Sequence, residues 1–385
     1  MKNKICTVFL LSACPAVQAQ PSMALYGLMD TNIEYVNHVG EVPSAANGFD
    51  PGDSKRKLRV NSGGYSGSRF GLRGTEDLGG GVKSIFVLEG GINIDTGTSQ
   101  QGGRLFGRQA FIGLSTKVGQ LTFGRQYSSI FSTLGKFVPA RYAIQYEPIV
   151  LIAGSNFRQD NTVKYLGTFG AVSVIGHWSS ATGSALPKTH PLLPSAGGAN
   201  GQPAQFRPNT AFGAGASYMS DNFGFGVGYD QWNPLIGSGA ARFRKLAVMA
   251  SYNPNDKTRL MGGYRWGKNT DPSGAVMLRD DFYWLGAQYR YSPKIEFIAE
   301  YNYQKIKSLA GQKQPSAWQL ALITSYSLSK RTRIYMSTAY SKNAGLTLDS
   351  AANSYASSLA TGNDYTLGNG HSSMLGVAFG IRHEF

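Results

Sequence analysis

Basic side chains recur at regular intervals in residues 66–92, SGSRFGLRGTEDLGGGVKSIFVLEGGI. Arg69 and Arg73 alternate with Phe70 and Leu72 before a glycine-rich break, and Lys83 and Glu89 belong to a second alternating run after it. Because successive side chains of a β-strand point to opposite faces, the four charges are predicted to share one face of a strand pair. The chemistry this predicts is electrostatic: in a confined, partly desolvated space, such a face favours anions more than in open water.

Residue types that carry catalysis or bind metals show no functional spacing. The sequence His383-Glu384-Phe385 is not a zinc motif, no glycine-rich phosphate loop precedes a predicted helix, and nothing places a Ser/His/Asp triad. The same holds for all five histidines: His38, His177, His190, His371 and His383. We therefore expect no enzymatic activity, no metal and no cofactor.

The first nineteen residues read as a removable leader. A short basic region is followed by an apolar run and by the small-residue cleavage site Val17-Gln18-Ala19, which is the pattern of a secretory signal peptide. Both cysteines, Cys6 and Cys14, lie in this segment, so the mature chain is expected to lack disulfides and thiolate sites. An alternative is a lipoprotein signal that would lipidate Cys14, but a lipid anchor would be redundant in the architecture predicted below.

Composition points to an exported all-β protein. Without the leader the chain keeps 35 basic and 22 acidic residues, a net charge of +13. Apart from Lys55-Arg56-Lys57 the basic residues are not clustered, and export makes nucleic acid a poor partner. No apolar run approaches the roughly 20 residues of a membrane helix, whereas 49 glycines, 21 tyrosines and 20 phenylalanines favour strands over helices.

Alternating runs of about ten residues recur along the chain, and we count sixteen predicted strands joined alternately by short and long connections. Short turns at one end and long loops at the other are typical of outer-membrane barrels, whereas soluble sandwiches mix loop lengths. The even number allows a closed antiparallel sheet without a free edge. Tyrosines at strand ends fit an aromatic girdle; they are Tyr218, Tyr252, Tyr291 and Tyr303. The predicted fold is therefore an all-β, 16-stranded antiparallel transmembrane β-barrel in a single domain, residues 20–385.

Several motifs of this chain resemble the general-diffusion porins of Gram-negative bacteria, most closely the β-proteobacterial group. They are Leu25-Tyr26-Gly27-Leu28-Met29-Asp30, Ser66-Gly67-Ser68-Arg69-Phe70-Gly71-Leu72-Arg73-Gly74, Glu76-Asp77-Leu78-Gly79-Gly80-Gly81, Phe123-Gly124-Arg125-Gln126 and Gly380-Ile381-Arg382-His383-Glu384-Phe385. The resemblance covers essentially the whole mature chain. It implies a trimeric barrel, an external loop folded into the lumen as a constriction, and a terminal Phe385 that is read by the outer-membrane assembly machinery.

The matching constriction loop is residues 128–157, the stretch that breaks the strand rhythm. Its charged residues are Lys136, Arg141 and Glu147, a net charge of +1, and it lacks the Pro-Glu-Phe-Gly run of the commoner pattern. By motif position the wall arginines of the family correspond to Arg69, Arg73, Arg108 and Arg125, and local alternation adds Lys83. Three alternatives stay open: the arginines could be ordinary solvated lumen charges, Glu147 an exposed loop carboxylate, and Glu89 the partner of a wall arginine.

These observations predict a passive, anion-preferring outer-membrane channel that crosses the membrane many times. The expected partners are membrane lipid and lipopolysaccharide, small hydrophilic solutes and anions, the assembly machinery, and two further copies of the chain in a homotrimer. One rival is a substrate-specific porin for an anionic nutrient. Others are a barrel enzyme such as a lipase or protease, and an adhesin or immune target built on the long loops.

Overall fold

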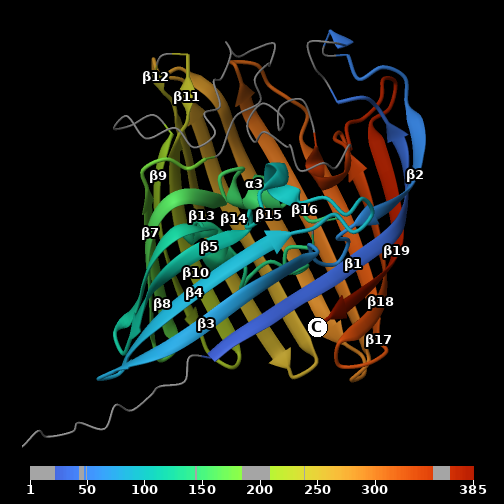
Figure 1. The fold of residues 1–385 in the computed structure, drawn as a ribbon. Helices are drawn as coiled ribbons and strands as arrows, with labels where there is room; N and C mark the ends of the chain where they lie inside the picture. The colour runs from blue at the N-terminus through green and yellow to red at the C-terminus, as the bar shows by residue number, and fades with distance from the viewer. Residues whose placement is uncertain are drawn as a thin grey trace, which may run out of the picture.

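A closed antiparallel barrel dominates the computed structural model of the chain (Figure 1). The structure describes residues 22–42, 47–48, 50–143, 145–183, 209–237, 239–349 and 365–385. The predicted leader, residues 1–19, and the lipidation alternative at Cys14 lie outside the described residues. Within the described residues no helix is both long and apolar enough to cross a membrane.

Seventeen strand segments form the main sheet. The first nine are β1 (Ser22–Val39), β2 (Lys55–Ser62), β3 (Arg69–Gly79), β4 (Val82–Gly91), β5 (Gln109–Thr116), β6 (Gly119–Tyr127), β7 (Arg158–Phe169), β8 (Val172–Ser179) and β9 (Thr210–Met219). The others are β10 (Phe223–Asn233), β13 (Arg242–Asn255), β14 (Thr258–Thr270), β15 (Val276–Arg290), β16 (Ile295–Leu309), β17 (Ala317–Ser327), β18 (Thr332–Lys342) and β19 (Ser373–Glu384).

These segments make sixteen wall positions, because β2 and β3 are successive parts of one interrupted strand. Both of them pair with β1: β3 pairs with residues 22–28 of β1, and β2 pairs with residues 31–39 of β1. The other edge of β1 pairs with β19 from Leu28↔Glu384 to Val36↔Gly376, which closes the ring. The predicted sixteen-stranded antiparallel barrel is confirmed, because β1 and β19 close the ring of strands. Among the described residues β2 pairs only with β1.

Short helical turns interrupt the connections, which the sequence did not predict. They are α1 (Gln100–Gly103), α2 (Ser129–Leu134), α3 (Ile149–Ala153) and the 3-10 turn η2 (Leu346–Leu348), and a small hairpin joins β11 (Leu235–Ile236) to β12 (Gly239–Ala240). The predicted all-β fold class is confirmed, and the described helical segments are confined to the connections between strands. Each of these helical segments is shorter than two turns of α-helix, and so short a segment has no recognisable amphipathic period.

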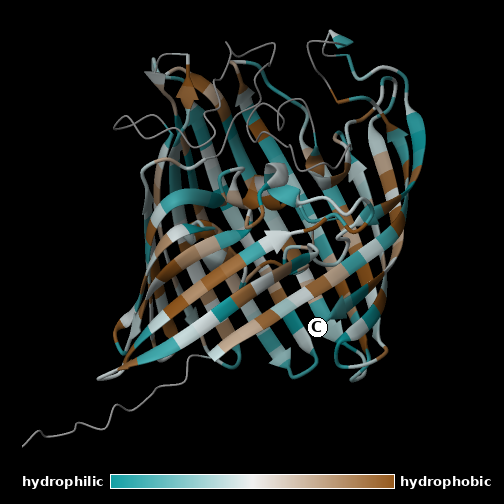
Figure 2. Ribbon diagram, viewed as in Figure 1, coloured by the Kyte–Doolittle hydropathy of each residue, from teal (hydrophilic) through white to brown (hydrophobic). Residues whose placement is uncertain are grey.

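Hydrophobic residues alternate with polar ones along the strands, as the brown and teal bands of Figure 2 show. On the outer face, Ile33, Phe225 and Leu285 are more than half exposed. On the inner face, Asp30, Glu300 and Gln319 are almost fully buried and hydrogen-bonded. A soluble sandwich would bury its apolar face; an apolar outer belt around a polar interior is the arrangement of a barrel in lipid.

Residues 128–157 fold into the barrel instead of projecting from it, and α3 lies inside the ring of strands (Figure 1). Ile130, Leu134 and Phe137 of this inner segment are almost completely buried against Ala247 and Trp284 of the wall. Apolar burial of this kind stabilises a segment by roughly 1.5–3 kcal/mol per large side chain. The inner segment is therefore attached to the wall by a hydrophobic core of its own.

A second inward feature is the break between β2 and β3, residues 63–68. The Asp30 carboxylate accepts backbone N–H bonds from Gly64 at 3.0 Å and Ser66 at 2.6 Å, together with the Tyr335 hydroxyl at 2.6 Å. These bonds hold the break against the wall, and they let Tyr65 pack among residues of the inner segment, including Ala140.

Candidate functional site

The inner segment follows one half of the wall and leaves the other half open. Its polar contacts mark the path in wall order: Ser129 with His177 of β8, Lys136 with Ser217 of β9, Asn156 with Asp230 of β10, Phe137 with Trp284 of β15, Ala140 with Glu300 of β16, Tyr146 with Gln319 of β17, and Gln145 with Ser337 of β18 and Asn32 of β1. The inner faces of β3–β7 are therefore the part of the wall that borders the remaining passage.

Arg69 and Arg73 lie on the inner face of β3, as local alternation predicts. They pair across β3–β4 with Gly91 and Val87, on the same face as Glu89. Among the described residues neither arginine forms an ion pair, and Arg73 stacks over the Tyr26 ring at 5.0 Å. Two guanidinium charges on this wall thus lack a carboxylate partner.

Arg108 is placed differently, because its charge is compensated inside the wall. Its Nε donates to Glu89 at 2.7 Å and a terminal nitrogen donates to the Tyr127 hydroxyl at 3.0 Å. Arg108 and Glu89 are each about 5% exposed. The alternative in which Glu89 pairs with a wall arginine is therefore correct. Arg108 braces β4, β5 and β6, and contributes little uncompensated charge to the passage.

Arg125 reaches the interior through an irregularity in β6. Its pairing with Ala110 would put it on the face of Phe123, which is the outer one, but the β6–β7 register shifts at this point. Gly124 next to it has φ +128, and a Cβ there would lie 2.3 Å from the Ala110 carbonyl oxygen. The shift aims Arg125 at Asp160, with an N···O distance of 2.6 Å.

Arg104 shares the Asp160 carboxylate with Arg125, at 2.8 Å. Sequence reasoning missed Arg104, which lies before the start of β5 at Gln109 and finds its partner only in the folded chain. Two guanidinium groups on one carboxylate leave a net positive charge at the open wall. The alternation of β2 and β7 could have added Arg59, which pairs with Glu34 at 2.8 Å, and Lys164, which donates to the Tyr127 carbonyl at 3.1 Å.

Lys83 lies beside the β3–β4 turn, paired with Asp77, at the end of the strands away from Arg69. It is on the inner face, as predicted, but near the rim of the barrel rather than level with the arginines.

The three charged residues of the inner segment have three different environments. Lys136 donates to Ser173 and Ser217, and its partial burial lowers the pKa of the ammonium group. Arg141 pairs with Glu296 at 2.7 Å and keeps nearly half of its side chain exposed. Glu147 is 3% exposed, so the alternative of an exposed loop carboxylate is wrong. Burial and the neighbouring Glu300 carboxylate raise the pKa of Glu147 well above its ordinary value.

Both ends of the inner segment are fixed to the wall. Ser128 caps α2 by accepting the Phe131 N–H, and the next residue, Ser129, meets His177 Nδ1 at 2.8 Å. At the other end Asn156 donates to Asp230 at 2.8 Å, and His177 Nε2 lies 3.6 Å from the same carboxylate. The Ser129, His177 and Asp230 side chains are all but fully buried, so this trio serves as an anchor rather than as a site open to substrate.

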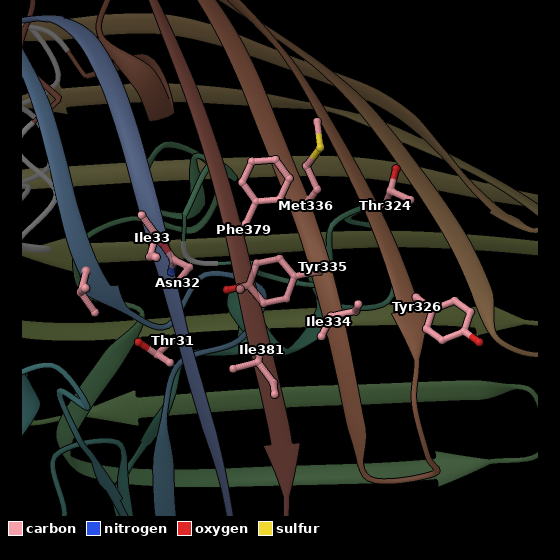
Figure 3. A pocket seen from close by; sticks show the side chains of 12 residues that line it. Thr31, Asn32, Ile33, Thr324, Tyr326, Ile334, Tyr335, Met336, Phe379 and Ile381 are labelled. Atoms are coloured by element: carbon pink, nitrogen blue, oxygen red, sulfur yellow. The ribbon is translucent and has the colours of Figure 1, made fainter.

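One concavity of the wall faces away from the passage. A groove of about 600 Å³ crosses β1, β2 and β17–β19 on the outer face, where Ile33, Met336, Phe379 and Ile381 line it (Figure 3). These side chains are 40–60% exposed, as expected for a surface in contact with lipid or protein. Within the described residues no cluster of His, Cys, Asp or Glu suits a metal ion.

Comparisons with known proteins agree with this geometry. The family model described as Gram-negative porin matches residues 6–346. Outer membrane porin protein 32 of Delftia acidovorans is 28% identical over the whole of both chains. An outer membrane porin protein of Bordetella pertussis is 40% identical over 169 residues, 43% of this chain and 44% of its own length. Among solved structures, an anion-selective porin from Comamonas acidovorans matches 95% of this chain and 100% of its own, with a TM-score of 0.71 and 26% identity.

Proposed function

This chain belongs to the Gram-negative porin family, and on that premise we propose that it is a passive outer-membrane channel that prefers anions. The barrel encloses the passage, and the start of β1 and the C-terminal end of β19 lie at the same end of it. Solutes cross by diffusion through the water-filled interior, and no energy source or covalent chemistry is involved.

The observation that carries the anion preference is the pair Arg69 and Arg73, which lie on the open wall without an ion-pair partner among the described residues. Arg104 and Arg125 add to it, since they share one carboxylate. A charged wall in a narrow, low-dielectric enclosure raises the local concentration of counter-ions. The anion selectivity of the Comamonas acidovorans porin, 26% identical, supports the same sign.

Residues 128–157 are proposed as the constriction that sets the size limit. The segment is attached to one half of the wall, so it narrows the passage toward the arginines of β3–β7. Arg141 keeps part of its charge exposed on this segment, while Lys136 and Glu147 are held within it. Lys83 is proposed to act as a positive charge near the mouth.

The reversal potential of single channels in a tenfold salt gradient tests this function. If the passage is positively charged, the reversal potential has the sign of an anion-selective channel. A reversal potential of the opposite sign would overturn the proposed anion preference. Conductance that rises linearly with salt fits general diffusion. A conductance that saturates at a low concentration of one organic anion would favour the alternative, a substrate-specific porin.

The assembly of the channel is part of the same proposal. We infer a homotrimer, with lipid and lipopolysaccharide around it and with Phe385 recognised by the assembly machinery. Phe385 exchanges backbone hydrogen bonds with Gly27 at 3.1 and 3.2 Å, and the residue is 44% exposed. Chemical cross-linking in outer membranes, followed by electrophoresis, tests the trimer. Cross-linked samples that show only the monomer band would contradict it.

A further inference from the structure

Cationic side chains form a row on the outer face of β13–β16. Arg244 of β13 pairs across the sheet with Lys268 of β14, and Lys268 pairs with Arg279 of β15. Lys305 and Lys307 continue the row on β16. Alternation assigns the row to the outer face: Arg244 has the same parity as Leu246, which is 43% exposed.

The row lies at the level where the apolar belt ends. Directly next to it along the strands come Leu246 and Trp266, and then the tyrosines Tyr264, Tyr283 and Tyr303, whose rings form a chain of contacts at 5.0 and 6.1 Å. Tyrosine and tryptophan on a lipid-facing surface mark the boundary between hydrocarbon and headgroups. The row therefore lies in the headgroup layer.

The long connections identify which headgroup layer this is. Gln231, the pairing partner of Arg244, also pairs with Phe212, close to where the connection between β8 and β9 returns to the wall. The short turns between β13 and β14 and between β15 and β16 lie at the opposite end. In bacterial outer-membrane barrels long loops are extracellular, so the cations face the outer leaflet.

A carboxylate holds the centre of the row in place. Asp281 accepts the Tyr264 hydroxyl at 2.8 Å, Arg279 at 2.7 Å and Lys307 at 2.8 Å, and its side chain is only 4% exposed. Arg279 also stacks over Trp266 at 5.2 Å. Arg244, Lys268 and Lys305 have no ion pair among the described residues, so five cations surround one acid.

We propose that this row binds the phosphorylated headgroup of an outer-leaflet glycolipid. Guanidinium and ammonium groups form charge-assisted hydrogen bonds with phosphate oxygens. The neighbouring aromatic and aliphatic side chains would contact the sugar–acyl boundary of the same molecule. A phosphate carried by a lipid is favoured over a free one, because the row is continuous with the hydrocarbon-facing belt. The inference rests on the proposed function, since it needs the barrel to span the membrane with its long loops outside.

The test compares lipid binding by the wild-type barrel with binding by a variant that combines Arg244→Gln, Lys268→Gln and Lys305→Gln. These three cations have no carboxylate partner to be orphaned among the described residues. The matched control, Lys257→Gln with Lys294→Gln and Lys330→Gln, removes the same charge from the short turns. Detergent-solubilised protein is titrated with bisphosphorylated lipid A, with the same glycolipid after phosphatase treatment, and with inorganic phosphate, and bound lipid is counted by native mass spectrometry.

We expect the row variant to bind lipid A at least about tenfold more weakly than the control, because each basic residue near an anionic membrane surface strengthens the attraction. Equal binding by the two variants, equal binding of the dephosphorylated lipid, or displacement by millimolar phosphate would each overturn the proposal. A further variant with Lys268→Arg and Lys305→Arg should bind like the wild type, and loss of binding there would also count against it. Conductance recordings of the wild type and of all variants in phospholipid bilayers separate the two claims. If the wild-type protein conducts ions but does not bind lipid A, this inference alone is refuted. If it does not conduct, the proposed function is refuted.

Discussion

Arginines line two halves of the same barrel interior, and the two halves use them differently. On the half that borders the passage, Arg69 and Arg73 have no acidic partner in the described structure. On the half beneath the inner segment, Arg265 is 2% exposed and forms two hydrogen bonds with Asp280, at 2.6 and 2.8 Å. An arginine in water can remain unpaired, whereas one removed from water needs a compensating charge. Burial therefore goes with compensation in both halves, since Arg108 of the open wall is also buried and paired, with Glu89. The difference is that the open half also holds Arg69 and Arg73, which form no ion pair among the described residues and can act on the passage.

The covered half gives the largest expected effect. Asp280→Asn would leave the Arg265 guanidinium buried without a charge partner, which costs about 3–5 kcal/mol. We expect a clear loss of unfolding free energy in detergent and little change of ion selectivity in the barrels that form. Urea unfolding followed by tryptophan fluorescence measures this. Lys55→Gln, which removes an exposed pair with Glu41 at 3.4 Å, is the control and should unfold like the wild type.

The open half should show the reverse behaviour. Arg69→Glu together with Arg73→Glu places two carboxylates where two unpaired guanidinium groups lay. We expect the reversal potential to move toward cations by several-fold in permeability ratio, with unfolding nearly unchanged. The control is Lys257→Glu with Lys294→Glu, in the turns outside the passage. If the turn variant shifted selectivity as much as the wall variant, the comparison between the two halves would not hold.

A buried acid on the inner segment adds a pH dependence. Burial and the nearby Glu300 raise the pKa of Glu147, whereas a released segment would ionise near the ordinary value of 4.5. Attachment is therefore strongest below pH 4.5 and weakens as the pH rises, by at most about 1.4 kcal/mol per pH unit for one proton, until Glu147 itself ionises. Single-channel noise should increase between pH 5 and pH 9, and Glu147→Gln should remove this increase. A variant with the wild-type pH profile would exclude Glu147 as its source.

The smallest effect is expected at the start of the inner segment. Ser128→Ala removes the cap of α2 and should cost about 1 kcal/mol locally. We expect more frequent brief closures in single-channel records at an unchanged main conductance. Ser128→Asn, which keeps a capping oxygen, should restore the wild-type closure rate; if it closes as often as the alanine variant, the cap is not the cause.

Local patterns predicted the barrel because strand alternation is a property of neighbouring residues. Phe223, Phe225 and Val227 alternate with glycines, and they lie on the outer face of β10 as the pattern implies. The prediction was weaker where the chain leaves the wall. Arg104 precedes β5 and joins Asp160, a partner 56 residues away. No period in the sequence could indicate that contact.

The candidate site was predicted in part for the same reason. Alternation is enough to put Arg69 and Arg73 on the inner face, and those positions agree with the structure. The sequence around a charged residue does not show whether an opposite charge will compensate it or whether it will be buried. Arg141 pairs with Glu296, which is 155 residues away. Glu147 is buried beside Glu300 only because the inner segment folds against β16. A count of charges in the sequence therefore overstates the number that face the passage.

The seam between β1 and β19 has a consequence for biogenesis. Each strand in between needs two neighbours, but β1 obtains its second neighbour only when β19 arrives, more than 330 residues later in synthesis. Until then an insertion-competent ring cannot exist, and the exposed strand edges of a partial chain would invite aggregation. The ring can therefore close only after the whole chain through β19 has been synthesised.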